Sequence, residues 1–191
     1  MTASAHPHVL LVDDEPAILQ ALVRTLRRGS GDGLWPPLRI EAFTDPVAAL
    51  ARAREQTFTL AMSDFRMPGM NGAQFLAGLR DRQPDCRRVI LSAHADFEGL
   101  AHAVNSARIA RFLSKPWNEA ELLAAVREQL EEHRRHREIE LLAERQRLAQ
   151  GELSPQEAER RRLERLEPGI TQVHWSSDGA YVLDLADAGA A

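Results

Sequence analysis

Three aspartates and one lysine are the residues of this chain whose types most clearly suggest chemistry. Asp13 and Asp14 follow one short apolar run, Asp64 follows a second, and Lys115 follows a third. Lys115 is also the only lysine, since every other basic side chain apart from histidine is arginine. Carboxylates held close together raise one another's pKa unless a cation lies between them. Three such groups therefore predict a bound divalent cation, and ligation by oxygen alone suits Mg²⁺.

Phosphoryl transfer is the chemistry that this set could perform. A carboxylate beside a metal ion and an ammonium can attack a phosphoryl group, while positive charge and a hydroxyl stabilise the transition-state oxygens. Asp64 is the best candidate nucleophile because it stands alone after its apolar run, and Ser92 after another run could supply the hydroxyl. The segment 65–72 is rich in Pro and Gly and could hold backbone carbonyls at the metal.

Five β-prone runs alternate with helical patterns between His8 and Gln129, which is typical of βα units around a parallel sheet. The runs cover residues 9–12, 39–43, 59–63, 88–92 and 110–113. The second run alternates polar and apolar residues and predicts an edge strand, whereas the first, third and fourth predict central strands. Helix starts are expected at Pro16, Asp45-Pro46, Asn71-Gly72, Asp96, and Asn118 with Glu121.

These units predict an α/β fold, a flavodoxin-like doubly wound five-stranded parallel sheet. Ligands bind such sheets at the carboxyl ends of the strands, so the three aspartates, Ser92 and Lys115 should meet on one rim. The segment 29–37 holds three glycines and two prolines, which predicts a long, mobile loop before the edge strand.

The composition changes beyond Gln129 to Glu, Arg, Leu and Ala. This predicts a helix that continues to about residue 149, without the regular apolar spacing of a coiled coil. Ser154 and Glu157 form a capping box for a short helix over 155–166, and an Asp-Gly turn predicts a small β-hairpin over 170–185. We therefore expect one domain over residues 8–130 and a C-terminal extension over 131–191.

Composition limits the class of protein. The chain has 191 residues, with 28 acidic and 24 basic side chains and a net charge of −4. One well-cored domain with an extension fits this length, and a large multidomain enzyme does not. A single cysteine excludes an intramolecular disulfide and favours a reducing, cytoplasmic setting. With no signal-like N-terminus or long apolar run, neither export nor a membrane span is expected, and the acidic balance argues against general nucleic-acid binding.

The motifs resemble the receiver domain of two-component response regulators. The resemblance is carried by Asp13-Asp14-Glu15, by Asp64 with Met67-Pro68-Gly69-Met70-Asn71-Gly72, by Ser92-Ala93 and by Lys115-Pro116. It implies that a sensor histidine kinase or phosphotransfer protein donates a phosphoryl group to Asp64. It also implies that Mg²⁺ is held by Asp13, Asp14, Asp64 and the backbone carbonyl of Arg66, and that Lys115 and Ser92 contact the acyl phosphate.

Phe112 occupies the switch-aromatic position that the resemblance implies. It lacks the hydroxyl of the more familiar Tyr, so a switch would be read by packing alone, and a plain core role is an open alternative. Arg66, Ala93 and His94 lie where the family tunes the access of hydrolytic water, which implies an altered phosphoryl lifetime of undetermined direction.

The output is less well defined by the sequence. The stretch 111–117 is similar to receivers that precede HD-GYP phosphodiesterases or certain transcriptional outputs, but none of these outputs fits in the remaining residues. We expect a dimeric regulator that signals by protein contacts, uses its extension for dimerisation or for docking a partner, and turns over no external substrate. Two alternatives stay open: a transcriptional regulator with a small DNA-binding tail, and an aspartate-based phosphatase of the haloacid dehalogenase type. Asp13-Asp14 lacks the DxD spacing that such a phosphatase needs.

Overall fold

A five-stranded parallel sheet forms the centre of the protein, as the sequence predicts. The computed structural model describes residues 6–93 and 107–166. The strands are β1 (His8–Val12), β2 (Arg39–Phe43), β3 (Leu60–Asp64), β4 (Arg87–Ala93) and β5 (Arg111–Lys115), in the order β2-β1-β3-β4-β5. The order reverses at β1, which pairs with β2 on one side and β3 on the other. The rim beside β1 and β3 is therefore the topological switch point, where ligands bind in open α/β sheets.

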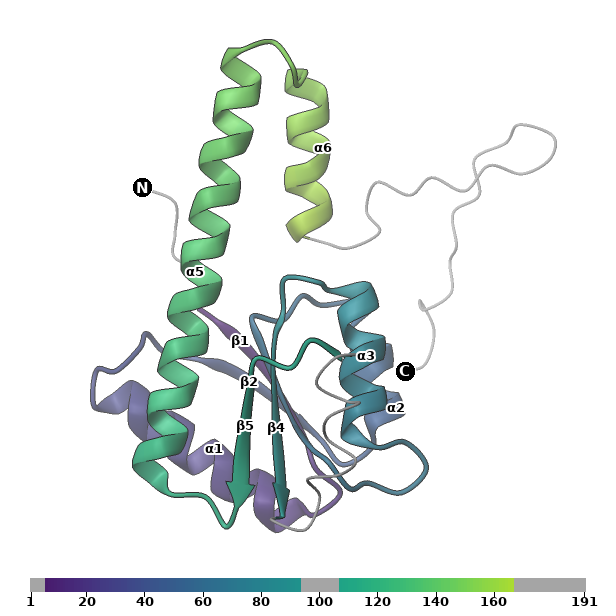
Figure 1. Ribbon diagram of the computed structural model, residues 1–191, viewed down its shortest axis with the longest axis vertical. Helices are drawn as coiled ribbons and strands as arrows, with labels where there is room; N and C mark the ends of the chain where they lie inside the picture. The colour runs from purple at the N-terminus through teal and green to yellow at the C-terminus, as the bar shows by residue number, and fades with distance from the viewer. Residues whose placement is uncertain (1–5, 94–106, 167–191) are drawn as a thin grey trace, which may run out of the picture.

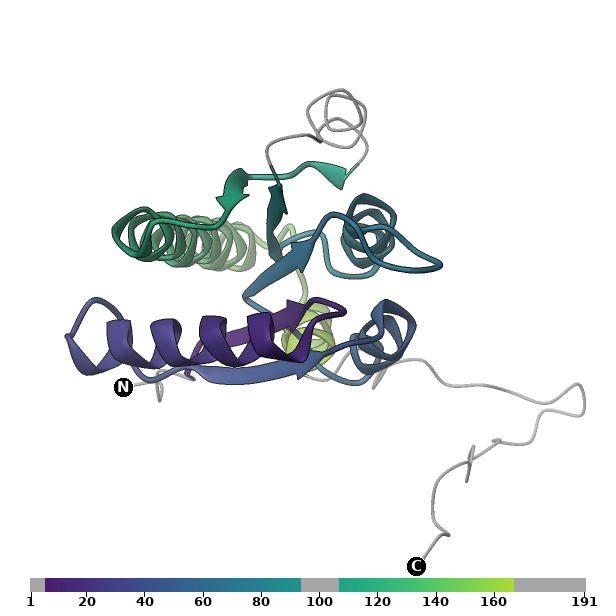
Figure 2. The ribbon, with the colours of Figure 1, turned by 90° about the horizontal axis from the view of Figure 1, so that it is seen from below.

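Helices cover both faces of this sheet. Helices α1 (Pro16–Gly31) and α5 (Glu119–Ala149) pack on one face, and α2 (Pro46–Arg52) and α3 (Gly72–Arg82) pack on the other (Figure 2). Each face has its own apolar core, built around Leu11 and Leu22 on the α1–α5 side and around Leu10 and Phe75 on the α2–α3 side. The predicted helix start at Asp96 and the predicted hairpin over 170–185 lie outside the described residues.

Strand burial follows the position of each strand in the sheet. Every residue of β1 and β3 is buried, because helices cover both of their faces and strands flank them on both sides. The prediction that residues 39–43 form an edge strand is confirmed, since β2 ends the sheet and each of its residues keeps some exposure. The sequence places Asp64 and Lys115 directly after their strands, but the structure includes them as the last residues of β3 and β5. The reason is that pairing with β4 continues through both residues.

Side-chain caps start the helices where the sequence suggests. The Asp45 carboxylate accepts a hydrogen bond from the Val47 N–H at the start of α2. Asn71 forms a reciprocal capping box with Gln74 at the start of α3, and Asn118 accepts from the Glu121 N–H at the start of α5. These bonds satisfy backbone donors that the first helical turn leaves free.

The segment 29–37 differs from the prediction of a long, mobile loop. Helix α1 continues through Gly29 to Gly31, and Trp35 is only 6% exposed. A Cβ atom on Gly29 would lie 2.2 Å from the Trp35 ring, so the missing side chain leaves the space that the indole fills. The prediction was wrong for residues 29–31, because the glycine content was interpreted as backbone freedom, whereas Gly29 provides close packing. Residues 32–38 do form a loop before β2, and Gly33 in it adopts a φ of +74°.

The extension begins as an uninterrupted continuation of α5. This helix runs for 31 residues, and after a turn at Gly151 the chain returns as α6 (Pro155–Leu166) beside it (Figure 1). The Ser154 hydroxyl accepts from the Glu157 N–H at the start of α6, as the predicted capping box requires. Within the described residues, no helix combines the length and apolar character needed to cross a membrane.

Two contacts join α5 to the body of the sheet near the start of β4. Arg87 Nε donates to Gln129 Oε1 at 3.0 Å, and His133 Nδ1 lies 3.1 Å from the Asp85 carbonyl oxygen. Beyond them, Ile139 and Leu142 lie on α5 with exposed side chains. The helix is thus anchored at its first half and presents apolar groups on its second half.

Candidate functional site

Asp13 is a fully buried carboxylate at the end of β1. Its backbone N–H donates to the Phe43 carbonyl at 3.2 Å, which fixes Asp13 at the carboxyl ends of β1 and β2. One carboxylate oxygen accepts from the Glu15 N–H at 3.0 Å, and the other accepts from Lys115 Nζ at 2.6 Å. A charge in this position is tolerated because both of its oxygens have donors.

Asp64 ends β3 and shares the same ammonium. Its Oδ1 atom contacts Lys115 Nζ, and the residue is 6% exposed. Burial raises the pKa of Asp64, while the hydrogen bond from Lys115 and the backbone N–H of Arg66 act in the opposite direction. Burial lowers the pKa of Lys115, but its hydrogen bonds to Asp13 and Asp64 outweigh this effect, so its pKa is raised and the ammonium stays charged. The result is a partly buried cation shared by two buried carboxylates.

The loop after Asp64 is held close to that residue by Gly72. The Gly72 N–H donates to the Phe65 carbonyl at 2.9 Å, and a Cβ atom at this position would lie 2.0 Å from the Asp64 backbone oxygen. Gly69 adopts a φ of +76°, which a glycine allows without strain. The sequence marked Gly72 only as a helix start, so its role in placing Asp64 was missed. The run of Pro and Gly after Asp64 was the signal for it.

Ser92 and Phe112 lie on the neighbouring strands. Ser92 lies in β4 and is 1% exposed. It follows Leu91, which lies opposite Asp64 of β3, and it lies opposite Ser114 of β5. Phe112 is partly buried and packs against the core on the α2–α3 side. The structure therefore places the predicted hydroxyl near the rim, and the predicted switch aromatic on the sheet face beside it.

Asp14 and Arg66 complete the predicted set at the same rim. Asp14 is exposed next to buried Asp13, and Arg66 follows Asp64 by two positions. Two buried carboxylates share one ammonium here, and Asp14 adds a third negative charge. The atoms available to bind a metal are carboxylate and carbonyl oxygens, which are the ligands that Mg²⁺ prefers. These residues therefore fit a divalent cation of that kind.

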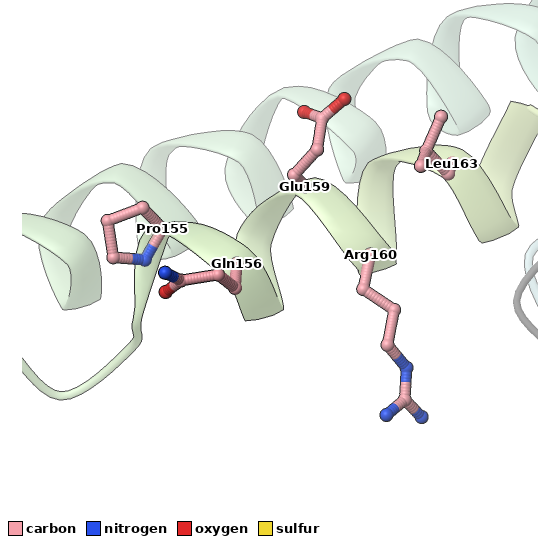
Figure 3. Close-up of a pocket in the computed structure, with 5 residues that line it drawn as sticks. All are labelled: Pro155, Gln156, Glu159, Arg160 and Leu163. Atoms are coloured by element: carbon pink, nitrogen blue, oxygen red, sulfur yellow. The ribbon is translucent and has the colours of Figure 1, made fainter.

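The predicted residues gather at one end of the sheet, away from the extension. The strands run toward the bottom of Figure 1, whereas α6 lies at its top. A shallow hollow along α6 is lined by Pro155, Gln156, Glu159, Arg160 and Leu163 (Figure 3). Glu159 and Arg160 point in different directions there, and Glu159 accepts a hydrogen bond at 2.8 Å from Arg162 on the same helix. This hollow gathers no set of groups able to act on a substrate.

Comparison with known proteins gives a family. Residues 9–127 match the response regulator receiver domain. The chain is 33% identical to the signal receiver domain of an HD domain-containing protein from Pseudomonas fluorescens Pf-5, with a TM-score of 0.65 over 72% of this chain and 96% of that one. Because the family match covers more than half of the chain, this protein belongs to the response regulator receiver family of two-component systems.

Two curated relatives are longer proteins with different outputs. The hydrogenase transcriptional regulatory protein HoxA of Cupriavidus necator is 35% identical over 64% of this chain and 24% of its own length. The cyclic di-GMP phosphodiesterase response regulator RpfG of Xanthomonas campestris pv. campestris is 34% identical over 61% of this chain and 30% of its own length. This chain thus spans less than a third of either relative, and the shared part is the receiver.

One buried residue of β4 was also unforeseen. The sequence suggested a wholly apolar strand, but Arg88 is 6% exposed there. Its guanidinium donates to the carbonyls of Ala107, at 2.8 Å, and of Pro84, at 3.2 Å. Burial lowers the pKa of Arg88, and the carbonyl acceptors satisfy its donors. The side chain therefore connects the chain before β4 to the chain before β5.

Proposed function

We propose that this protein accepts a phosphoryl group on Asp64 from a sensor histidine kinase or phosphotransfer protein. The observation that carries the proposal is the single Lys115 ammonium in contact with both Asp13 and Asp64 at the carboxyl ends of the strands. This arrangement supplies a fixed nucleophile and a fixed cation at one point of the rim. Membership of the receiver family supports the same function.

The transfer step follows from these positions. An Asp64 carboxylate oxygen attacks phosphorus, the P–N bond of the donor phosphohistidine breaks, and its electron pair returns to the donor imidazole. Lys115 would neutralise charge on the transferred oxygens, and it is held in place by Asp13. A Mg²⁺ ion held by Asp13, Asp14, Asp64 and the Arg66 carbonyl would supply further positive charge to the phosphoryl oxygens. The Ser92 hydroxyl would donate a hydrogen bond to an oxygen of the phosphoryl group.

Signalling would then use protein contacts. Movement of Ser92 toward the phosphoryl group would allow Phe112 to repack, which changes the surface beside β4 and β5. We propose that the extension forms a homodimer, and that the protein works in the cytoplasm without turning over an external substrate. The exposed side chains of Ile139 and Leu142 support the proposed dimer face, because water contact with such groups is unfavourable.

A transcriptional regulator with a DNA-binding tail is the alternative. Relatives such as HoxA, a hydrogenase transcriptional regulatory protein, support it. The charges of the described extension favour protein contacts instead. Arg134 lies 3.7 Å from Glu138, Arg162 lies 2.6 Å from Glu159, and Arg135 pairs with Glu132. Arginines paired in this way supply little net field for phosphate backbones. Retention of the full chain on duplex DNA at moderate salt would favour the alternative.

Labelling with a small phosphoryl donor tests the main proposal. The full chain incubated with Mg²⁺ and acetyl phosphate should gain one phosphoryl group, measured by intact-mass spectrometry, and removal of Mg²⁺ by EDTA should prevent it. Asp64→Asn should abolish the gain. Asp81→Asn, at an exposed position of α3, is the matched control and should label like the wild type. Persistent labelling of Asp64→Asn would reject Asp64 as the acceptor.

A further inference from the structure

A separate group of metal-ligand side chains lies where α5 passes the start of β4. Asp85, His136 and Glu140 each direct one ligand atom into a region in which all three atoms lie within 4.8 Å of one another. His136 Nε2 is 3.4 Å from Glu140 Oε1 and 3.9 Å from Asp85 Oδ1. Asp85 precedes β4, whereas Asp64 ends β3 at the opposite edge of the sheet. This cluster is therefore distinct from the candidate phosphoacceptor site.

The backbone holds these ligand atoms near the spacing that Zn²⁺ requires. His136 and Glu140 are four residues apart on α5, so they are neighbours on one helix face. Asp85 is fixed against the same helix by the contact of its carbonyl with His133 Nδ1. A tetrahedral Zn²⁺ with ligand bonds of about 2.0–2.1 Å separates its ligand atoms by about 3.3–3.4 Å. The His136–Glu140 distance of 3.4 Å meets this value, and the Asp85–His136 distance of 3.9 Å exceeds it by about 0.5 Å, so the ion would have to draw the Asp85 carboxylate closer.

The charges also favour a cation at this point. Two carboxylates face a single imidazole nitrogen, which as a neutral ring can donate to at most one of them. Arg137 contacts the other oxygen of Glu140, Oε2, at 3.3 Å, and this orients Oε1 toward His136. One imidazole nitrogen with two carboxylate oxygens is a ligand combination that Zn²⁺ accepts, with water in the fourth position.

We propose that Asp85, His136 and Glu140 bind one Zn²⁺ ion and that this ion fastens α5 to the body of the receiver. The ligands come from two parts of the chain, so the ion would join the turn before β4 to the helix that leads into the extension. Such binding stabilises the folded state because the unfolded chain does not hold the three ligands together. The proposal is independent of phosphoryl transfer to Asp64.

Zinc titration of the metal-free full chain tests the proposal. Isothermal titration in the presence of excess Mg²⁺ should show a single Zn²⁺ bound per chain, and the same Zn²⁺ should raise Tm. His136→Gln and Glu140→Gln should each weaken binding by about tenfold or more. Glu138→Gln, which changes an exposed carboxylate on the same helix, should bind like the wild type. The ligands are exposed or partly exposed, so circular dichroism should show unchanged helix content in all variants.

The outcomes separate this site from the acidic rim. Co²⁺ in place of Zn²⁺ should give the visible absorption of a tetrahedral site in the wild type, and His136→Gln should lose it. Zinc binding that persists in His136→Gln but disappears in Asp13→Asn would place the ion at the rim and overturn the proposal. Absence of stoichiometric binding at micromolar Zn²⁺ would also overturn it.

Discussion

The Lys115 ammonium lies 2.6 Å from the Asp13 carboxylate, although β3 and β4 separate the strands that these residues follow or end. The lysine ends β5 and its ammonium contacts both the residue after β1 and the last residue of β3, so it lies at the carboxyl ends of the central strands. The same nitrogen atom, Lys115 Nζ, also contacts Asp64 Oδ1. One flexible side chain therefore ties together the two buried acids of the rim.

Replacement of Lys115 by arginine should disrupt this arrangement although the charge is kept. A guanidinium is planar and forked, and the side chain at this position is 16% exposed, so the larger group cannot take the same contacts. We expect acetyl phosphate labelling of Asp64 to slow by about tenfold or more, since a charge-assisted hydrogen bond contributes about 1.5–3 kcal/mol. Arg80→Lys, at a partly exposed position of α3, should label normally. Wild-type labelling and switching in Lys115→Arg would show that the lysine is not required.

Gly72→Ala should disturb the phosphoacceptor through the backbone. The new methyl would lie 2.0 Å from the Asp64 oxygen, so the loop or the end of β3 must shift. We expect a loss of about 1–3 kcal/mol in the free energy of unfolding, together with slower labelling of Asp64. In Gly78→Ala on the same helix, the new methyl would meet side chains alone, Leu50 at 3.4 Å and Arg82 at 3.7 Å, and labelling should stay intact. Urea denaturation and intact-mass spectrometry measure both effects, and equal labelling by the two variants would contradict the assignment.

The half-buried imidazole of His133 should make stability fall in mild acid. Burial lowers its pKa, while the unfolded chain has the ordinary histidine value of about 6.5. Between the two values the unfolded state binds more protons, so the free energy of unfolding decreases as pH falls below about 6.5. His133→Gln should lose less stability than the wild type between pH 7.5 and 5.5 in urea denaturation. His8, whose pKa burial also lowers, should retain part of the effect in that variant. An identical loss in both proteins would rule out this role for His133.

The dimer should depend on the exposed apolar residues of α5. Ile139 and Leu142 are 66% and 57% exposed, so their replacement by glutamate would not disturb the core. The double variant should be monomeric by light scattering if the wild type is dimeric through this face. Val47→Glu, at an exposed position of α2, is the control and should remain dimeric. A monomeric wild type would reject the proposed dimer itself.

The central or edge character of the strands and the positions of the rim residues were predictable from sequence because they depend on local patterns. Continuous apolar runs predicted β1 and β3 as central strands, and alternation predicted β2 as an edge. Asp13, Asp64 and Lys115 then had to meet, since the carboxyl ends of parallel strands share one edge. The family roles of these residues remain predictions that the labelling experiments test.

Other features depend on contacts between distant parts of the chain, which no local pattern records. The slot that Trp35 fills exists because Gly29 lacks a side chain and Leu123 of α5 lies opposite. The approach of Asp85 to His136 joins positions 51 residues apart, and only the four-residue spacing of His136 and Glu140 could have suggested it. The burial of Arg88 likewise depends on carbonyl groups distant in the sequence, such as that of Ala107, which accept its hydrogen bonds.

The length of α5 gives the receiver a mechanical lever. At about 1.5 Å per residue the 31-residue helix is about 46 Å long, and about 24 Å of it lies beyond His133, which contacts the Asp85 carbonyl. A tilt of about 5° at that contact would displace the far end of the helix by about 2 Å, which is enough to bring packed side chains out of register. A small rearrangement at the sheet would therefore reach a partner at the tip as a movement of side-chain size.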